Sequence, residues 1–167
     1  LFGGSTWNTR VLREHGLTNV DTFLQGVDLD LFRPIPRGRG ERFVVYSGGK
    51  LEHRKGQDIT VTAFREFVKT HPDAVLTTTW HNPWPEMMRG ITLGGHVSNV
   101  PQCDSDGMCD IVRWIAENGV PEENIHDYGM VSNHLMPKVF AQADVAVFPN
   151  RCEGGTNLVA MEAMASG

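Results

Sequence analysis

Short apolar runs alternate along the chain with segments of helical period. Residues 43–46 and 145–148 are continuous apolar runs with β-branched members, which is typical of parallel strands buried on both faces. Residues 74–80 and 125–130 are predicted to form two more strands. Because a helical segment separates each strand from the next, we expect one parallel sheet with residues 43–46 and 145–148 as interior strands.

Helical segments separate and flank these strands. Apolar residues recur at helical spacing, between typical start and stop residues, over residues 8–15, 59–68, 110–118, 133–143 and 158–165. A short strand is expected at residues 20–25. Residues 81–108 keep neither period for long, and such a long segment without structure is uncommon in a compact domain. We interpret it as an insertion that is either functional or a contact surface.

Composition narrows the class of protein. The chain has 167 residues, 40% of them hydrophobic, which is enough for one core and one domain. Its formal net charge of −5 provides no general basic field, so nucleic acid is not expected as the main partner. No apolar run approaches the roughly 18 residues of a transmembrane segment, and no N-terminal signal is visible. We therefore expect a soluble, cytoplasmic protein without a transmembrane segment.

The cysteines do not predict a disulfide framework. Cys103, Cys109 and Cys152 are odd in number and include no CxxC pair, so reduced thiols are expected. Asp104-Ser-Asp106 resembles a metal-binding pair of carboxylates, but an N-terminal helix cap at Asp106 or Asp110 is the favoured interpretation. Zinc-binding residue types also occur here, at spacings that match no standard site: His81, His96, Cys103 and Cys109. No metal site is predicted.

The last seventeen residues combine a glycine-bearing loop with the start of a helix. The loop follows the strand at residues 145–148 and carries Gly154 and Gly155, which let a ligand approach the backbone. Unpaired N–H groups and the positive end of the helix dipole suit an anion such as phosphate at Thr156, Asn157 and Leu158. The alternative is a tight turn with a purely structural role.

Two carboxylates flank this helix start. Glu162 shares a helix face with apolar neighbours, so its side chain is expected to be partly buried. A buried carboxylate has only acceptors to offer, and a vicinal diol such as a ribose would supply donors. Glu153, in the loop, is expected on the other side of the same mouth. The alternative is that Glu162 is a partly exposed helix residue.

A second glycine-rich loop follows the strand at residues 43–46. It runs from Ser47 to Gly56 and contains Gly49, Lys50 and Lys55. Glycines and cations directly after a strand favour a phosphate site, and Lys is a serviceable phosphate cation although it lacks the bidentate fork of Arg. The alternative is a solvated surface loop.

These motifs resemble the donor-binding domain of GT-B glycosyltransferases, specifically the retaining family four with its paired-glutamate motif. The resemblance rests on Glu153-Gly-Gly-Thr-Asn-Leu158 and Glu162-Ala-Met-Ala-Ser-Gly167. Eight residues separate the two glutamates here, one more than the common spacing, which moves Glu153 relative to the helix. The segment Gly26 to Pro34 is similar to the hinge that follows the family's acceptor domain.

The resemblance implies an α/β fold with a Rossmann-like parallel sheet and helices on both faces, the C-terminal half of a GT-B fold. Residues 1–34 are then the tail of the acceptor domain and the hinge. Residues 35–41 form an exposed linker. Residues 35–167 form the nucleotide-sugar-binding domain, expected to be truncated at its C-terminus.

The same resemblance implies roles for individual residues. Lys50 stands where the family has Arg and, with Gly49, Lys55 and the helix start at Gly154 to Leu158, would hold the diphosphate of a nucleotide-sugar donor. Glu162 would hold the ribose, and Glu153 would face the transferred sugar as the catalytic residue. No cofactor and no metal ion are then required. The acceptor remains an unspecified sugar, lipid or protein, and the chain alone is expected to be inactive.

Two other functions fit parts of the pattern. A nucleotide-sugar epimerase on the same fold would need acids and a histidine from elsewhere. A flavodoxin-like receiver or binding module would place acidic residues after its first strand, where this chain has Ser47-Gly-Gly-Lys50. At the carboxyl end of the strand at residues 125–130, Met130 and Val131 are candidates to flank a base.

Overall fold

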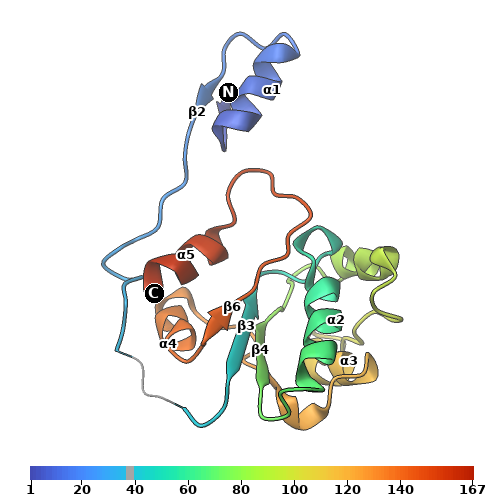
Figure 1. Ribbon diagram of the computed structural model, residues 1–167. Coiled ribbons are helices and arrows are strands. Elements are labelled where there is room, and N and C mark those ends of the chain that lie inside the picture. Colours follow the sequence, from blue (N-terminus) through green and yellow to red (C-terminus); the bar gives the residue numbers. More distant parts are fainter. Residues whose placement is uncertain (37–39) are drawn as a thin grey trace.

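The computed structural model describes residues 1–36 and 40–167, which form a small N-terminal unit and a larger α/β unit (Figure 1). The N-terminal unit contains β1 (Phe2–Gly3), α1 (Thr6–Glu14) and β2 (Asp21–Thr22). The Ser5 side chain accepts a hydrogen bond from the Asn8 backbone and so caps α1. An extended segment leads down to the larger unit. Residues 37–39 of the expected linker lie outside the described residues.

A parallel sheet forms the centre of the larger unit. Its strands are β3 (Val44–Gly48), β4 (Val75–Thr79), β5 (Ile125–Asp127) and β6 (Val145–Ala146). Within the described ranges they lie in the order β5-β4-β3-β6, and every neighbouring pair is parallel. The predicted parallel α/β sheet is confirmed, with β3 in its interior.

β6 does not have the predicted interior position. Among the described strands it pairs with β3 alone, and 41% of Val145 is exposed. The apolar run at residues 145–148 indicates burial against helices on both faces, and such a pattern carries no information on whether a second strand follows at the side. The prediction of an interior strand was therefore wrong for β6.

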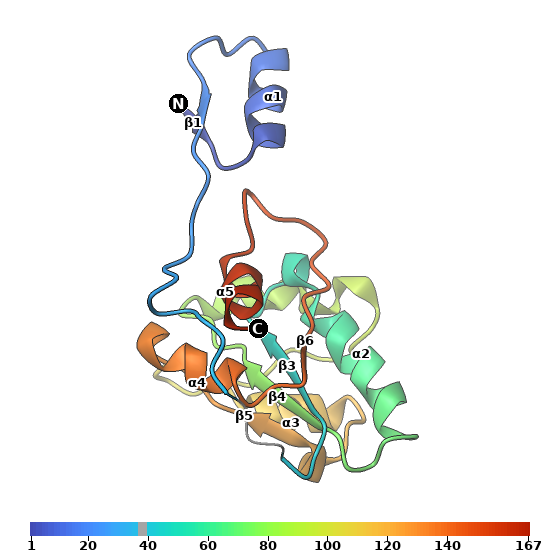
Figure 2. The same ribbon diagram turned by 60° about the vertical axis from the view of Figure 1, so that its left-hand side comes forward.

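Helices cover both faces of the sheet (Figure 2). One face carries α2 (Gln57–Val68) and α3 (Ile111–Glu117), whose apolar residues form one core with Leu76 and Trp80. The other carries α4 (Met136–Phe140) and α5 (Leu158–Ser166), which pack around Tyr46 and Phe32. Asp110 accepts from the Arg113 backbone and so caps α3, as predicted. In the described ranges every helix is too short or too polar to cross a membrane.

The segment predicted to lack regular structure contains a 3₁₀ helix, η2 (Pro85–Gly94). Met88 and Ile91 of η2 are buried in the same core as α2 and α3. Side chains of a 3₁₀ helix recur every three residues, so they do not match the α-helical period used for the prediction. Shorter 3₁₀ turns occur at η1 (His53–Lys55), η3 (Glu122–Asn124) and η4 (Asn133–Leu135).

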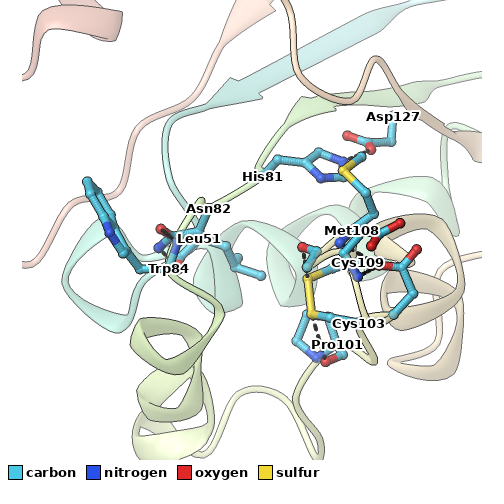
Figure 3. Close-up of a disulfide and its surroundings, with 12 residues drawn as sticks. Leu51, His81, Asn82, Trp84, Pro101, Cys103, Met108, Cys109 and Asp127 are labelled. Atoms are coloured by element: carbon cyan, nitrogen blue, oxygen red, sulfur yellow. Dashed lines mark hydrogen bonds and ion pairs between the residues drawn. A yellow bond between two sulfur atoms is a disulfide. The ribbon is translucent and has the colours of Figure 1, made fainter.

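A disulfide joins Cys103 to Cys109, which contradicts the expectation of three reduced thiols (Figure 3). The intervening residues form a tight hairpin, in which Asp104 accepts backbone hydrogen bonds from Asp106 and Met108. This turn brings the two Cα atoms to 3.9 Å. The hairpin closes a spacing that matched no known pattern in the sequence. The remaining cysteine, Cys152, is free and exposed.

Candidate functional site

A cleft of about 340 Å³ opens at the carboxyl ends of β3, β4 and β5. Ligands of open α/β sheets collect at this edge. Its walls come from the loops that follow these strands and from α4 and α5. The lining residues are Gly49, Lys50, Lys55, Thr79, His81, Gly129, Met130, Val131, Asn133, Met136, Val159 and Glu162.

Two other hollows, of about 380 and 390 Å³, flank β6. Their walls are mainly apolar and contain no lysine or arginine among the described residues. The cleft, in contrast, presents two lysines, a histidine and a glutamate. An anionic or polar ligand therefore matches the cleft better than either hollow.

The loop after β3 brings Lys50 to the cleft. Gly49 has a φ of +102°, a left-handed conformation that favours glycine, and it turns the chain there. The buried Gln57 side chain donates to the carbonyls of Gly49 and Lys50 and so fixes the turn. The Lys50 ammonium lies 4.6 Å from the ring centroid of Trp84 and 3.8 Å from a Glu52 oxygen. These contacts hold the Lys50 cation at the cleft.

Lys55 and Arg54 are paired with the carboxylate of Glu153. The Lys55 ammonium and the Asn150 amide both donate to Glu153 Oε1, and Arg54 Nη1 donates to Oε2 at 2.6 Å. Arg54 also lies 2.6 Å from Glu52. In the structure, therefore, the carboxylate of Glu153 occupies the position of an anion beside the lysine that lines the cleft.

The helix α5 carries Glu162 into the cleft from the opposite side. Burial raises the pKa of the Glu162 carboxyl, and a hydrogen bond with the Asn133 side chain acts in the opposite direction. The Asn157 side chain caps α5 by accepting from the Ala160 backbone. Because Asn133 is a partial partner, Glu162 is not wholly free for a ligand.

The loop between β6 and α5 also contacts the N-terminal unit. Thr156 donates a hydrogen bond to the Gln25 side chain at 2.9 Å. Gly155 packs against Gly4 so closely that a side chain on either would have to displace the other's backbone. Both ribbon views show the loop reaching toward the N-terminal unit (Figures 1 and 2). Gly155 is thus placed where a small residue is needed for packing.

A buried ion pair anchors the start of this loop. Both guanidinium nitrogens of Arg151 lie 2.7 Å from the carboxylate oxygens of Asp58, which is fully buried in α2. Such a bidentate pair fixes orientation as well as distance. The position of Glu153, two residues later, is therefore tied to α2.

The structure brings part of the predicted site together. The residues that line the cleft are Gly49, Lys50, Lys55 and Glu162, along with Met130 and Val131. The other predicted site residues lie in the adjoining loop and helix start and are not among its lining residues: Glu153, Gly154, Gly155, Thr156, Asn157 and Leu158. Within the described ranges there is no group of three or more His, Cys, Asp or Glu that could hold a metal ion.

Several site residues escaped the sequence analysis. His81 was considered only as a zinc ligand, although it lies two residues after β4, at the edge where polar residues collect. Asn133 and Asn150 occupy equivalent places after β5 and β6. Polar residues that follow each buried strand were the available signal. The pairing of Glu153 with Lys55 joins residues 98 positions apart, and spacing alone does not reveal it.

Comparison with known proteins adds an independent line of evidence. The family model for group 1 glycosyl transferases matches residues 41–167. The chain is 29% identical over 157 residues to a GDP-mannose-dependent alpha-(1-6)-phosphatidylinositol monomannoside mannosyltransferase of Mycolicibacterium smegmatis, covering 85% of this chain and 35% of the relative. The corresponding protein of Mycobacterium tuberculosis is 30% identical over 157 residues, with 85% and 34% covered. The chain thus spans about a third of the length of these relatives.

Solved structures show the same fold. Sucrose-phosphate synthase from Thermosynechococcus elongatus superposes with a TM-score of 0.69 at 20% identity, over 99% of this chain and 38% of that chain. The C-terminal domain of the glycosyl transferase group 1 family protein LpcC from Francisella tularensis has a TM-score of 0.57 at 20% identity, over 84% and 67%. At this identity the likeness concerns the fold alone, and that fold is the parallel α/β fold of GT-B glycosyltransferases.

Proposed function

The chain belongs to the family of group 1 glycosyl transferases, and from this we propose that it is the donor-binding part of an enzyme that transfers a sugar from a nucleotide-diphosphate sugar to an acceptor. The observation that carries the proposal is that Lys50, Lys55 and Glu162, from distant parts of the chain, line one cleft. That cleft lies at the carboxyl ends of a parallel sheet, where such folds bind nucleotides.

The residues around the cleft suit the parts of such a donor. Negative charge builds on the leaving diphosphate as the glycosidic bond breaks, and prearranged cations lower the barrier to that step. Lys50, Lys55 and the N–H groups at the start of α5 would supply this stabilisation. Glu162 would accept hydrogen bonds from the ribose hydroxyls. We propose that no metal ion is needed, because the chain's own cations would offset the diphosphate charge.

Binding would require an exchange of partners at Lys55. Its ammonium is bonded to Glu153, so a diphosphate must replace that carboxylate or share the cation with it. Release from Lys55 would free Glu153 to face the transferred sugar. We propose this exchange as the step that places the catalytic carboxylate, in a reaction that retains the configuration of the sugar, as the paired-glutamate motif implies.

The relatives suggest which donors to test. Two are described as GDP-mannose-dependent, and a more distant structure, the glycosyltransferase TarM of S. aureus, was solved with UDP at 14% identity. GDP-mannose is therefore the first donor to examine and UDP-sugars the second. The acceptor, whether sugar, lipid or protein, would be set by parts of the enzyme outside the cleft.

Isothermal titration of the chain with GDP, UDP and ADP tests the proposal. We expect at least one of them to bind, and Lys55→Ala to weaken that binding by roughly tenfold, since a hydrogen bond to a charged group is worth about 1.5 kcal/mol or more. Lys69→Ala, an exposed lysine of the same surface that pairs only with Glu66 among the described residues, is the matched control. Binding should persist after treatment with EDTA. Equal affinities for wild type and Lys55→Ala would contradict the assignment.

A further inference from the structure

His81 lies in the wall of the cleft, and the donor contacts proposed above do not use it. Its Nε2 atom is 2.7 Å from Oδ2 of Asp127, the last residue of β5. Both side chains are about nine-tenths buried, with 9% of His81 and 10% of Asp127 exposed. Figure 3 shows the imidazole and the carboxylate pointing toward one another. The pair is therefore a fixed feature of the site.

Asp127 is held on both sides. Its second carboxylate oxygen accepts a hydrogen bond from the Thr78 hydroxyl at 2.6 Å. Because an ionised carboxylate only accepts, the Nε2 atom of His81 must carry the hydrogen that joins the pair. In the neutral imidazole, the Nδ1 atom then has a lone pair and acts as an acceptor. Asp127 thus sets the tautomer of the ring.

The Nδ1 atom of His81 has no partner within the described part of the chain. It is also absent from the unpaired atoms that are sealed from solvent, which in the same part of the chain are one atom each of His53, Thr60 and Trp80. An accessible, unpaired acceptor on a nearly buried ring is ready for a donor group of a ligand or for water.

The order of the strands places His81 between two parts of the cleft. β4 lies between β3, which leads to Lys50, and β5, which leads to Met130 and Val131. A nucleotide with its phosphates at Lys50 would extend toward the apolar side chains after β5. A nucleobase has an apolar face for those side chains and N–H groups at its edge.

We infer that His81, oriented by Asp127, accepts a hydrogen bond from an N–H group of the nucleobase and so recognises the base of the bound nucleotide. This inference rests on the proposed function. His81 is then a specificity-determining residue, and Asp127 a positioning residue that acts through the ring.

Titration of GDP, UDP and pyrophosphate into wild type, His81→Ala and Asp127→Asn tests the inference. We expect His81→Ala to weaken the better-bound nucleoside diphosphate by about fivefold to tenfold, the effect of one lost hydrogen bond. The affinity for pyrophosphate, which has no base, should stay unchanged. Asp127→Asn should give the same selective loss, because an asparagine amide can donate to Nε2 and turn Nδ1 into a donor. His126→Ala, an exposed ring beside Asp127 on β5, is the control and should change neither affinity.

Each other outcome overturns a different statement. An equal loss for pyrophosphate and for the nucleotide would mean that His81 contacts phosphate or shapes the site, and an unchanged nucleotide affinity would mean that it contacts nothing. Either result overturns the base contact while the proposed function stands. If wild type binds none of the nucleoside diphosphates, the proposed function itself fails. Thermal unfolding shows whether each variant is folded, and Asp127→Asn decides if His81→Ala is not.

Discussion

At the scale of single residues, the carboxylate of Glu153 controls the cations beside the cleft. It bonds to Lys55, Arg54 and Asn150. The sequence identified Lys55 and Glu153 as two separate ligand contacts, because motifs describe residues one at a time. In the folded chain they are partners of each other, so an incoming anion competes with Glu153.

Replacing Glu153 by Gln removes that competitor. We expect Glu153→Gln to bind pyrophosphate about threefold to tenfold more tightly, a gain of the size typical of a partly screened ion pair. Titration calorimetry measures the change. Glu66→Gln, which removes an exposed carboxylate paired with Lys69 on α2, should leave the affinity unchanged. A weaker affinity in Glu153→Gln would show instead that Glu153 positions Lys55 for the ligand.

Glu162 is predicted to lower the stability of the ligand-free chain at neutral pH. Burial raises the pKa of its carboxyl, against the hydrogen bond with Asn133, so the folded state holds the proton more tightly than the unfolded state. Stability then falls as the pH rises from the ordinary carboxyl pKa through the raised one, and the loss is complete above it. Glu162→Gln should melt at a higher temperature than wild type at pH 7, with a difference that vanishes well below about pH 4.

The same substitution tests the ribose contact. Glu162→Gln should weaken a ribonucleotide by about tenfold to a hundredfold, as expected for hydrogen bonds to a charged acceptor, and should barely affect its 2′-deoxy form. Titration with GDP and 2′-deoxy-GDP, or with the UDP pair, measures both. Equal losses for the two forms, or a lower melting temperature without any loss of affinity, would make Glu162 a structural residue.

At the scale of elements, local signals predicted what local physics decides. The apolar runs of β3 and β4, the cap of α3 at Asp110 and the start of α5 at Leu158 were all readable from neighbouring residues. The pairing of β1 with β2 and the edge position of β6 depend on partners distant in the sequence. The 3₁₀ period of η2 and the hairpin of the disulfide belong to geometries that helix and strand templates do not describe.

The disulfide hairpin makes its own prediction. Cross-linking Cys103 and Cys109 restricts the unfolded chain, and for so short a loop the entropic model gives roughly 2 kcal/mol. Reduction, or Cys103→Ser, should therefore lower the melting temperature by about 4–8 °C for a chain of this size. Cys152→Ser, which removes the free thiol, should melt as wild type does. Thiol titration of the denatured, unreduced protein should find one thiol, and a count of three would contradict the disulfide.

At the scale of the whole molecule, the sheet order places the functional residues together. β5-β4-β3-β6 brings loops from residues 49–55, 79–81 and 129–133 to one edge, and α5 closes the cleft. The alternation of strands and helices predicted this parallel arrangement, while the contact of Thr156 with Gln25 joins the N-terminal unit to the loop before α5 in a way that no pattern indicated.

The chain is expected to bind donors without transferring sugar. It spans about a third of the length of its curated relatives, and a transferase also needs a site for its acceptor. Incubation of the chain with radiolabelled GDP-mannose and a lipid or sugar acceptor should yield no product above background. Robust transfer by the 167-residue chain would contradict this expectation.

The most direct test of the central claim is to map where a nucleoside diphosphate binds. Titration of the isotope-labelled chain with GDP or UDP, followed by backbone amide chemical shifts in NMR spectra, reports every contacted segment. We expect the largest shifts in residues 48–56, 79–81, 129–133 and 157–162, which surround the cleft, and little change in residues 140–146 beside the apolar hollow. Shifts concentrated around β6, or none at saturating ligand, would contradict the account.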